Sequence, residues 1–262
     1  MRCSSLTTLL IDADGVTYRC AAAVQKHIRW DDDIYTSHAD LKEAQNAFTA
    51  AIEGLRERVA ADPGIQMFDE EVDVILCFSC PSRRYFRHDL LPTYKATRKG
   101  ERPMVLSDLN AWASEVYETK TKPHLEADDV LGILATHPTL IKGDKIIVSI
   151  DKDMQQIAGL HMNPMDGEVF RVREEFAENF LWTQVLTGDT SDNYTGLPGC
   201  GPVKAKKILS SDPLFSPEDL VLAAYQKSGL TLEDMTTQVN VARILTATTY
   251  DFKNKEPILW QM

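Results

Sequence analysis

Four short groups of acidic side chains stand out along this chain of 262 residues, because each falls at the edge of a predicted strand or helix or in a short polar motif. Such groups can share one site in ionised form only with cations between them, because like charges raise each other's pKa. Oxygen ligands without matching His or Cys favour Mg²⁺ or Mn²⁺, and two such ions roughly 4 Å apart can stabilise the attacking and leaving oxygens of a phosphodiester. The residues are Asp12 and Asp14, then Glu126, Asp128 and Asp129, then Asp151 and Asp153, then Asp189 and Asp192.

A plainer interpretation exists for single groups. Acids at the start of a helix, as in EADD (residues 126–129), stabilise the helix dipole. A DxD sequence after a strand, as at residues 151–153, is also typical of a turn. Repetition favours the metal site, because all four groups fall at places that can converge.

The segment from Arg83 to Arg102 reverses the charge balance of the chain. It holds seven basic residues against two acidic ones, with Tyr85, Phe86 and Tyr94 between them. Cations for phosphates and aromatic rings for bases favour single-stranded nucleic acid as the ligand. A solvated charged connection is the alternative. The basic residues are Arg83, Arg84, Arg87, Lys95, Arg98, Lys99 and Arg102.

The sequence GLPGCGPVKAKKIL, residues 196–209, is typical of a helix-hairpin-helix. Gly199 and Gly201 allow the backbone to approach a phosphate closely, and the start of the next helix offers free N–H donors. Lys204, Lys206 and Lys207 add positive charge. Such contacts bind the backbone of nucleic acid and do not read its sequence. A structural turn between two helices is the alternative.

Three apolar runs that predict buried strands position the acids. They are TTLLIDAD, DVILCFS and DKIIVSIDKD, which begin at Thr7, Asp73 and Asp144. Helical periodicity over residues 39–61 and 125–137 separates them, and helical patterns dominate after about residue 180. The order predicts an α/β fold with a central, mainly parallel sheet flanked by helices. Ligands of such sheets bind beyond the carboxyl ends of the strands, where the acids stand.

Composition adds expectations about the environment of the protein. Hydrophobic residues make up 44% and charged residues 26%, as in ordinary soluble domains. The net charge of −11 is only a weak argument against nucleic acid as a partner. We find no signal peptide, no run of about 18 apolar residues and no framework spacing among the five cysteines. We therefore expect a cytoplasmic protein in a reducing compartment, without membrane contact.

Taken in order, the motifs resemble those of the 5′ nucleases. The order runs from IDAD through YKATR, EADD, DKD and GDTSDN to the glycine-rich hairpin. This group includes flap endonucleases and the 5′-nuclease domain of bacterial DNA polymerase I. The similarity is greatest to the 5′→3′ exonucleases of short-tailed phages, and it extends to the C-terminal stretch that begins at Leu230.

The resemblance implies a PIN-like nuclease domain over residues 1–183 with a basic arch at about residues 81–105. Residues 184–262 would form a helical DNA-binding region with a helix-hairpin-helix at 195–209. The implied activity is metal-dependent hydrolysis of DNA, and of RNA primers paired with DNA, by a 5′→3′ exonuclease or flap endonuclease of phage replication or recombination. Two Mg²⁺ ions, replaceable by Mn²⁺, would be the cofactors, and some relatives also hold K⁺ at the hairpin. The partner of this monomer would be DNA with 5′ ends, nicks or flaps, in the host cytoplasm.

The resemblance also assigns roles to single residues. Lys95 and Arg98 match basic arch residues that contact the scissile phosphate, and Tyr94 matches a position that can stack on the terminal base. The implied metal ligands are Asp12, Glu126, Asp128, Asp129, Asp151, Asp153, Asp189 and Asp192. The implied DNA contacts are Arg19, Arg83, Arg84, Tyr94, Lys99, Gly199, Gly201, Lys204, Lys206 and Lys207.

One position departs from the pattern of that family, which has an aspartate at the end of the second strand. Here CFSC places Cys80 there, and a thiol is a poor Mg²⁺ ligand, although Asp14 could take its role. A non-catalytic DNA-binding relative is therefore one alternative. The start IDADGV also resembles haloacid-dehalogenase-like phosphatases, in which Asp12 would be a covalent nucleophile. That fold has no use for EADD, the basic segment or the hairpin.

Overall fold

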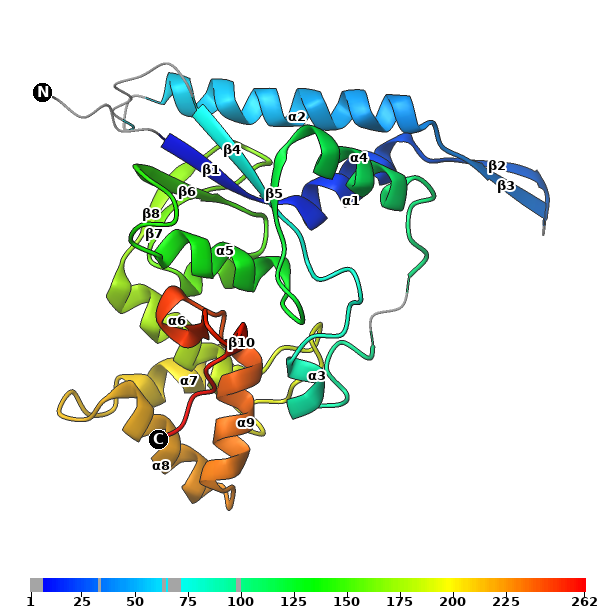
Figure 1. The fold of residues 1–262 in the computed structure, drawn as a ribbon. Helices are drawn as coiled ribbons and strands as arrows, with labels where there is room; N and C mark the ends of the chain where they lie inside the picture. The colour runs from blue at the N-terminus through cyan, green and yellow to red at the C-terminus, as the bar shows by residue number, and fades with distance from the viewer. Residues whose placement is uncertain (1–6, 33, 63–64, 66–71, 98–99) are drawn as a thin grey trace, which may run out of the picture.

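The computed structural model describes residues 7–32, 34–62, 65, 72–97 and 100–262 of the chain. Its centre is a six-stranded sheet in the order β5-β4-β1-β6-β7-β8 (Figure 1). All neighbouring strands run parallel except β8, which is antiparallel to β7. The predicted α/β class and mainly parallel sheet are therefore confirmed. The strands are β1 (Thr7–Asp12), β4 (Val72–Cys77), β5 (Glu118–Lys120), β6 (Asp144–Val148), β7 (Gly159–Met162) and β8 (Val169–Val172).

Helices cover both faces of the sheet, because alternate residues of a strand point to opposite sides. Leu9 and Ile11 of β1 belong to a core cluster with α1, α2 and α4. Leu10, between them, belongs to a second cluster with α5 and with Ile244 and Leu245 from the end of the chain. The helices are α1 (Ala13–Val24), α2 (Leu41–Ala61), α4 (Leu106–Val116) and α5 (Ala127–Thr136).

A third core cluster lies among the C-terminal helices. Tyr225 is fully buried there, and its hydroxyl donates to the carbonyl of Val185 at 2.7 Å. The expected boundary between residues 183 and 184 falls inside the continuous helix α6. The helices are α6 (Glu174–Thr187), α7 (Pro202–Leu209), α8 (Pro217–Lys227) and α9 (Leu232–Ala242). Shorter elements are α3 (Arg87–Leu90), the 3₁₀ helices η1 (Lys152–Gln156) and η2 (Ala247–Thr249), and the paired strands β9 (Tyr250–Asp251) and β10 (Glu256–Pro257).

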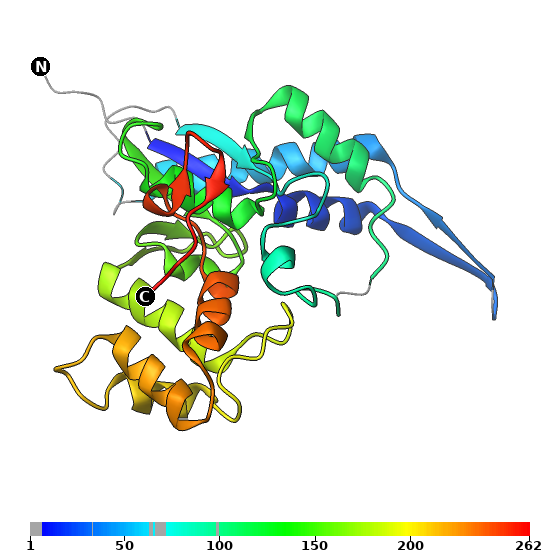
Figure 2. The same cartoon turned by 60° about the horizontal axis from the view of Figure 1, so that its bottom comes forward.

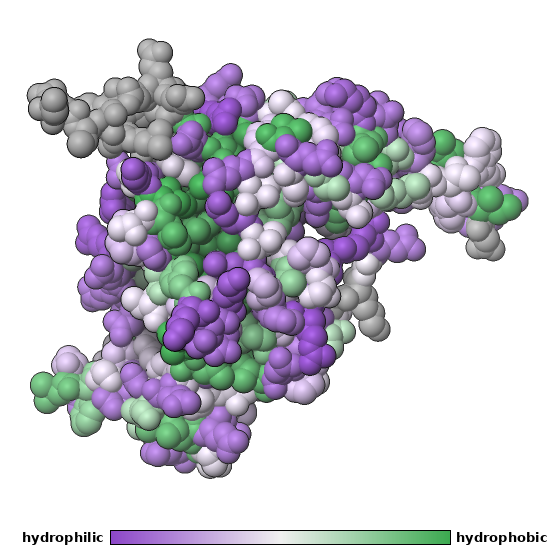
Figure 3. All heavy atoms as spheres, in the orientation of Figure 1, coloured by the Kyte–Doolittle hydropathy of each residue, from purple (hydrophilic) through white to green (hydrophobic). Residues whose placement is uncertain are grey.

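A hairpin that the sequence analysis did not predict projects from the body between α1 and α2 (Figures 1 and 2). It consists of β2 (Lys26–Asp31) and β3 (Ile34–His38), which pair with each other in an antiparallel ladder. The described residues of both strands are exposed, and Trp30 keeps 68% of its surface. Figure 3 shows apolar as well as polar residues on this arm.

The third predicted strand is shorter than expected, and this changes the setting of its acids. β6 ends at Val148, and the chain then leaves the sheet to start η1, with Asp151 as its capping residue. Asp151 and Asp153 therefore lie outside the strand, and the alternation of strand side chains does not orient them. Among the described residues, no helix has both the length and the apolar character needed to span a membrane.

Candidate active site

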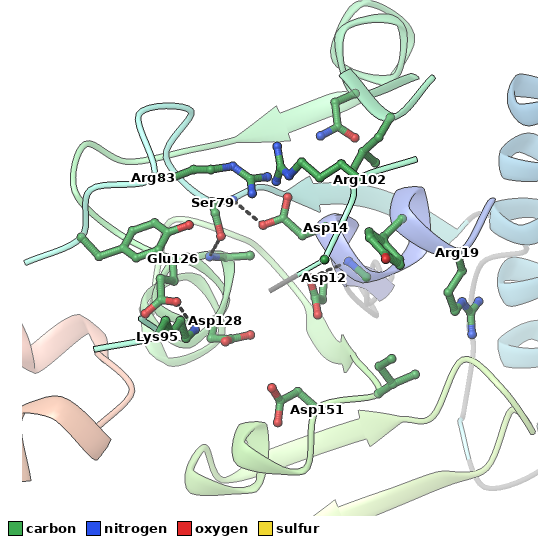
Figure 4. A pocket seen from close by; sticks show the side chains of 18 of the residues that line it. Asp12, Asp14, Arg19, Ser79, Arg83, Lys95, Arg102, Glu126, Asp128 and Asp151 are labelled. Carbon is green, nitrogen blue, oxygen red and sulfur yellow. Dashed lines mark hydrogen bonds and ion pairs between the residues drawn. The ribbon is translucent and has the colours of Figure 1, made fainter. Parts of the chain in front are cut away.

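An open pocket of about 930 Å³ lies beyond the carboxyl end of β1, between α1, α5 and the loop after β6 (Figure 4). Asp12, Asp128 and Asp151 line it from three separate elements, and Glu126 lies beside Lys95 at its edge. Parallel strands end at the same edge of a sheet, which is why residues so distant in sequence meet there. The structure thus brings four of the eight acids expected to bind metal into one cavity.

Local hydrogen bonds hold these carboxylates in place. Asp12 ends β1 and caps α1, accepting from the N–H of Gly15 at 3.3 Å and from the hydroxyl of Ser149 at 3.1 Å. Asp151 caps η1 by accepting from the N–H of Asp153 at 2.8 Å. An ionised carboxylate has about four acceptor sites, and capping a helix uses only some of them. Both residues therefore keep lone pairs for a ligand in the pocket.

Repulsion among the pocket acids shows in their pKa values. Burial, followed by the charge of Asp14, raises the pKa of Asp12 to about 6 from an ordinary 3.8. Burial, followed by the charges of Asp12 and Asp151, raises the pKa of Asp128 well above the same value. A bound cation removes this penalty, and a donor set made only of oxygen suits a hard divalent ion.

A second acidic group, formed by Asp153, Asp189 and Asp192, lies outside the described lining of this pocket. Burial, followed by the charges of Asp151 and Asp189, raises the pKa of Asp153 to about 7. Asp151 thus acts on this group as well as on Asp12 of the first. The acids form a continuous band with Asp151 between its two parts.

The described acids leave room for water around a bound ion. No three Asp, Glu, His or Cys side chains in the described part of the chain close around a common point. Mg²⁺ commonly keeps several waters and takes one or two carboxylates together with phosphates of the substrate. The band therefore fits cations that keep part of their water shell, and it does not enclose an ion completely.

Asp129 differs from the other acids of the EADD motif. Its carboxylate is fully buried and accepts from Arg87 at 2.6 and 2.8 Å and from the N–H of Leu245 at 3.1 Å. It does not belong to the described lining of the pocket. The structure does not bring Asp129 to the pocket acids, because buried partners occupy both of its oxygens. We therefore leave it out of the proposed metal ligands.

Tyr94 and Lys95, in the middle of the expected arch segment, join the two parts of the acidic band. The hydroxyl of Tyr94 donates to Glu126 at 2.9 Å and to Asp192 at 3.0 Å, and the ammonium group of Lys95 pairs with both carboxylates. Tyr94 is only 3% exposed, so in this structure its ring is not available to stack on a base. Arg98 and Lys99 lie outside the described residues.

Arginine side chains form the wall of the pocket opposite the acids. Arg83 and Arg102, from the two limbs of the expected arch, point toward each other above Asp14, and Arg19 lies on α1 (Figure 4). Arg84 pairs instead with Asp89 on the exposed surface. Sequence reasoning counted Arg102 only as part of a basic segment. The spacing between Arg102 and the YKATR motif did not indicate that the chain returns to the pocket at Arg102.

The structure separates Cys80 from the pocket acids. Its sulfur lies 3.2 Å from the hydroxyl oxygen of Ser82, and Cys80 is not part of the described pocket lining. Asp14 does line the pocket, and one of its oxygens accepts from the N–H of Ser79 at 3.1 Å. Asp14 therefore lies beside the end of the second predicted strand. The family's aspartate, which Cys80 replaces in this chain, would be expected in the same place.

The glycine-rich hairpin presents its polar groups to solvent. Gly201 caps α7, and Gly199 adopts a left-handed conformation with φ of 67°. Both glycines are exposed. The three expected lysines on α7 are exposed as well: Lys204, Lys206 and Lys207. The hairpin directly follows part of the acidic band in sequence. Asp189 of the band pairs with Tyr194 in a short antiparallel bridge, and the hairpin begins after that bridge. The residues between Asp189 and Tyr194 form a turn that this bridge closes.

Gly196 should be intolerant of any side chain, because it packs against the chain at Gly188. A Cβ atom at Gly196 would lie 2.3 Å from the backbone nitrogen of Gly188, and φ there is 60°. Gly196→Ala should therefore lower the free energy of unfolding by roughly 2–4 kcal/mol in denaturant titrations. Gly199→Ala is the matched control, since its φ is also positive but no atom lies within 4 Å. Equal losses from the two variants would contradict the described packing.

Divalent cations should stabilise the folded protein, and more so at higher pH. Asp12 and Asp153 have pKa values of about 6 and about 7 in the folded protein, against 3.8 ordinarily. The folded state then binds more protons than the unfolded chain, so without cations stability falls as pH rises from about 4 to about 7. Saturating Mn²⁺ should raise Tm by roughly 5 °C at about pH 8 and by less at about pH 5. A larger increase at the lower pH would contradict cation binding at these acids.

Comparison with known proteins assigns the chain to a family. Residues 7–181 match the family described as 5'-3' exonuclease, N-terminal resolvase-like domain. The exonuclease of Escherichia phage T7 is 26% identical, over 99% of this chain and 95% of its own. The flap endonuclease Xni of Shewanella pealeana is 31% identical, over 47% of this chain and 53% of its own.

A solved structure shows the same fold. The T5 5'-exonuclease with bound divalent metal ions (zinc) aligns with a TM-score of 0.58 at 16% identity, over 90% of this chain and 89% of its own. At that identity the likeness concerns the fold alone. With the family match over two thirds of its length, and with acids gathered at the carboxyl ends of its parallel sheet, the chain belongs to the 5'-3' exonuclease family.

Proposed function

We propose that this protein is a metal-dependent 5′→3′ nuclease that hydrolyses phosphodiester bonds of DNA. One observation carries the proposal: the carboxylates of Asp12, Asp128 and Asp151 line the same open pocket as several arginines, among them Arg83 and Arg102. Carboxylates repel phosphate, so the two sets serve one ligand only when cations lie between the acids and the phosphate. Family membership and the exonuclease of phage T7 support the same conclusion.

The proposed cation ligands are the acids of the band. One ion would lie at the pocket, held by Asp12, Asp128 and Asp151 directly or through water molecules, with Asp14 and Glu126 beside them. A second ion would lie beside Asp153, Asp189 and Asp192. When bound, the ions would stabilise the charge that develops on the attacking and leaving oxygens. Mg²⁺ is the ion we propose, with Mn²⁺ able to replace it, because both accept oxygen ligands.

The chain's own residues bind and orient the substrate in this proposal. Arg83 and Arg102 would bind phosphates of the strand that enters between the arch limbs, since each guanidinium offers a planar set of donors. Lys95 would leave Glu126 and Asp192 to neutralise the scissile phosphate. Arg98 would act beside it, as the resemblance implies.

The helical C-terminal region would hold the duplex next to the cut. Its exposed hairpin offers backbone N–H groups at the start of α7, with Lys204, Lys206 and Lys207 around them. A K⁺ ion at this hairpin stays an open prediction. We propose residues 184–262 as a DNA-binding region that shares α6 with the nuclease domain.

The biological setting follows from the relatives. We propose a monomer that acts in the host cytoplasm, in phage replication or recombination, on DNA with 5′ ends, nicks or flaps and on RNA paired with DNA. The match to a phage exonuclease and to a flap endonuclease supports this setting. The phosphatase interpretation was based on IDADGV and on GDTSDN (residues 188–193), and it loses support because the family match over residues 7–181 covers the first of these motifs.

A gel assay with labelled substrates tests the proposed function. A nicked duplex, a 5′-flap substrate and an RNA–DNA hybrid, each labelled at either the 5′ or the 3′ end of one strand, would be incubated with Mg²⁺, Mn²⁺ or chelator. We expect products shortened from the 5′ end and none with chelator. DNA binding without cleavage in either metal would favour the non-catalytic alternative, and shortening from the 3′ end would overturn the proposed polarity.

A further inference from the structure

The end of α9 and the extended chain directly after it, together residues 241–245, are held by side chains from other elements. The last carbonyls of a helix have no partner within the helix, and extended backbone that leaves it also needs partners from outside. Five backbone groups of this segment have a side-chain partner. Arg87 donates to the carbonyls of Val241 and Arg243 at 2.9 and 2.8 Å. Gln156 donates to the carbonyl of Ala242 at 2.8 Å and accepts from the N–H of Ile244 at 2.9 Å. Asp129 accepts from the N–H of Leu245 at 3.1 Å.

Two side chains, Arg87 and Gln156, connect this segment to the acid-bearing elements, and Arg87 makes more hydrogen bonds than Gln156. Arg87 is 3% exposed, and all five of its N–H donors are used. Besides the two carbonyls of the segment, it donates to both oxygens of Asp129, at 2.8 and 2.6 Å, and to Glu126 at 2.9 Å. Its burial excludes the phosphate contact that its place in the basic segment indicated. Arg87 instead ties the start of α5, where the acids Glu126 and Asp128 lie, to residues 241–245.

Gln156 makes the equivalent connection for the other acid-bearing element. It ends η1, which begins directly after Asp151 and contains Asp153. Its amide nitrogen donates to Ala242 and, at 2.6 Å, to Gln184 on α6, and its amide oxygen accepts from Ile244. Both the donor and the acceptor of this side chain are therefore used to hold η1 on the same segment.

Packing keeps the segment close to α5. Ile244 and Leu245 belong to the same apolar cluster as α5 and Ile157. A Cβ atom at Gly132 of α5 would lie 2.3 Å from the carbonyl oxygen of Leu245, so the segment and the helix touch along their backbones. The contact leaves little freedom for either element to shift alone.

We propose that residues 241–245, with Arg87 and Gln156 as positioning residues, set the separation of the two acid-bearing elements α5 and η1. The C-terminal end of the chain would then be part of the catalytic architecture without touching substrate. This inference rests on the proposed metal-dependent hydrolysis. Outer partners of metal ligands commonly change metal affinity or activity by 10–100-fold when they are removed.

Three single variants test the inference. Arg87→Lys keeps the charge but cannot form the planar set of contacts to two carbonyls and a carboxylate. Gln156→Leu removes all three amide contacts, including the one to Gln184, with a small change in volume, and it serves if Arg87→Lys folds poorly. Asn240→Leu is the matched control, because the buried amide of Asn240 accepts from the N–H of Trp260 at 2.7 Å and donates to the carbonyl of Trp260 at 3.1 Å, with no described contact to α5 or η1. For each, we would measure Mn²⁺ binding by electron paramagnetic resonance without DNA, kcat and KM for cleavage, and Tm.

We expect Arg87→Lys to raise the Kd for Mn²⁺ about tenfold and to lower kcat by about 10–100-fold, with KM for DNA within about threefold. Gln156→Leu should change Kd and kcat in the same direction by about threefold or more. Asn240→Leu should lower Tm but leave Kd and kcat at wild-type values.

Unchanged Kd and kcat in both Arg87→Lys and Gln156→Leu would overturn the inference, and so would an equal rise of Kd in Asn240→Leu. A change of KM alone in Arg87→Lys would also overturn it, since that marks a substrate contact. Failure of the proposed function looks different, because the wild-type protein itself would then bind no Mn²⁺ and cut no DNA, and this inference would fall with it.

Discussion

Replacing Asp151 by asparagine should lower kcat for DNA cleavage by roughly 10³-fold, which corresponds to about 4 kcal/mol of transition-state stabilisation. Asp151 lies between the two parts of the acidic band, because its charge acts on Asp12, on Asp128 and on Asp153. Its loss therefore removes charge from both proposed cation sites at once. The amide oxygen of asparagine can still cap η1, so folding should be preserved.

Single-turnover cleavage in saturating Mg²⁺ measures this effect, and a DNA-binding assay in chelator separates chemistry from docking. DNA affinity should stay within about tenfold of the wild type. Asp144→Asn is the control, since that exposed aspartate lies at the opposite end of β6. Cleavage by Asp151→Asn at the wild-type rate would remove Asp151 from the site, and with it the two-cation arrangement.

Lys95→Ala should lower kcat by roughly 10²-fold while KM for DNA changes by less than about threefold. In the structure the ammonium group pairs with Glu126 and Asp192, in a residue whose backbone φ is 54°. We propose that cations take over these carboxylates and free Lys95 for the scissile phosphate. A group that acts mainly on the reacting phosphate affects kcat more than substrate binding.

The control for this variant is Lys120→Ala, which removes an exposed lysine paired only with Glu118 at 2.8 Å among the described contacts. Steady-state kinetics on a nicked duplex would provide both constants. A rise in KM with unchanged kcat would show that Lys95 contributes to substrate binding and not to the chemical step.

The fold class and the meeting of the acids could be predicted from the sequence for one physical reason. Asp12 and Asp151 follow predicted parallel strands, and the carboxyl ends of such strands share an edge of the sheet. The acidic start of α5 belongs to the same edge, because the connection from β4 must return there. Periodicity and strand order thus carry information about position across more than a hundred residues.

Other features depend on contacts that sequence spacing cannot show. Asp129 is indistinguishable from Asp128 in EADD, yet it turns inward to Arg87 and to a segment 116 residues further along the chain. Tyr94 and Arg87 lie in a basic, aromatic segment typical of a nucleic-acid surface, and both are buried. The β2–β3 hairpin could not be predicted from apolar patterning, because its strands bury no face against the body.

The most direct test of the central claim is the position of Mn²⁺ in anomalous diffraction from crystals grown with that ion. The claim is that the acidic band binds the catalytic cations. It predicts one anomalous peak among Asp12, Asp128 and Asp151 and a second beside Asp153, Asp189 and Asp192, with none beside Asp129. Peaks found only at surface carboxylates such as Asp166, with the band empty at saturating Mn²⁺, would contradict it.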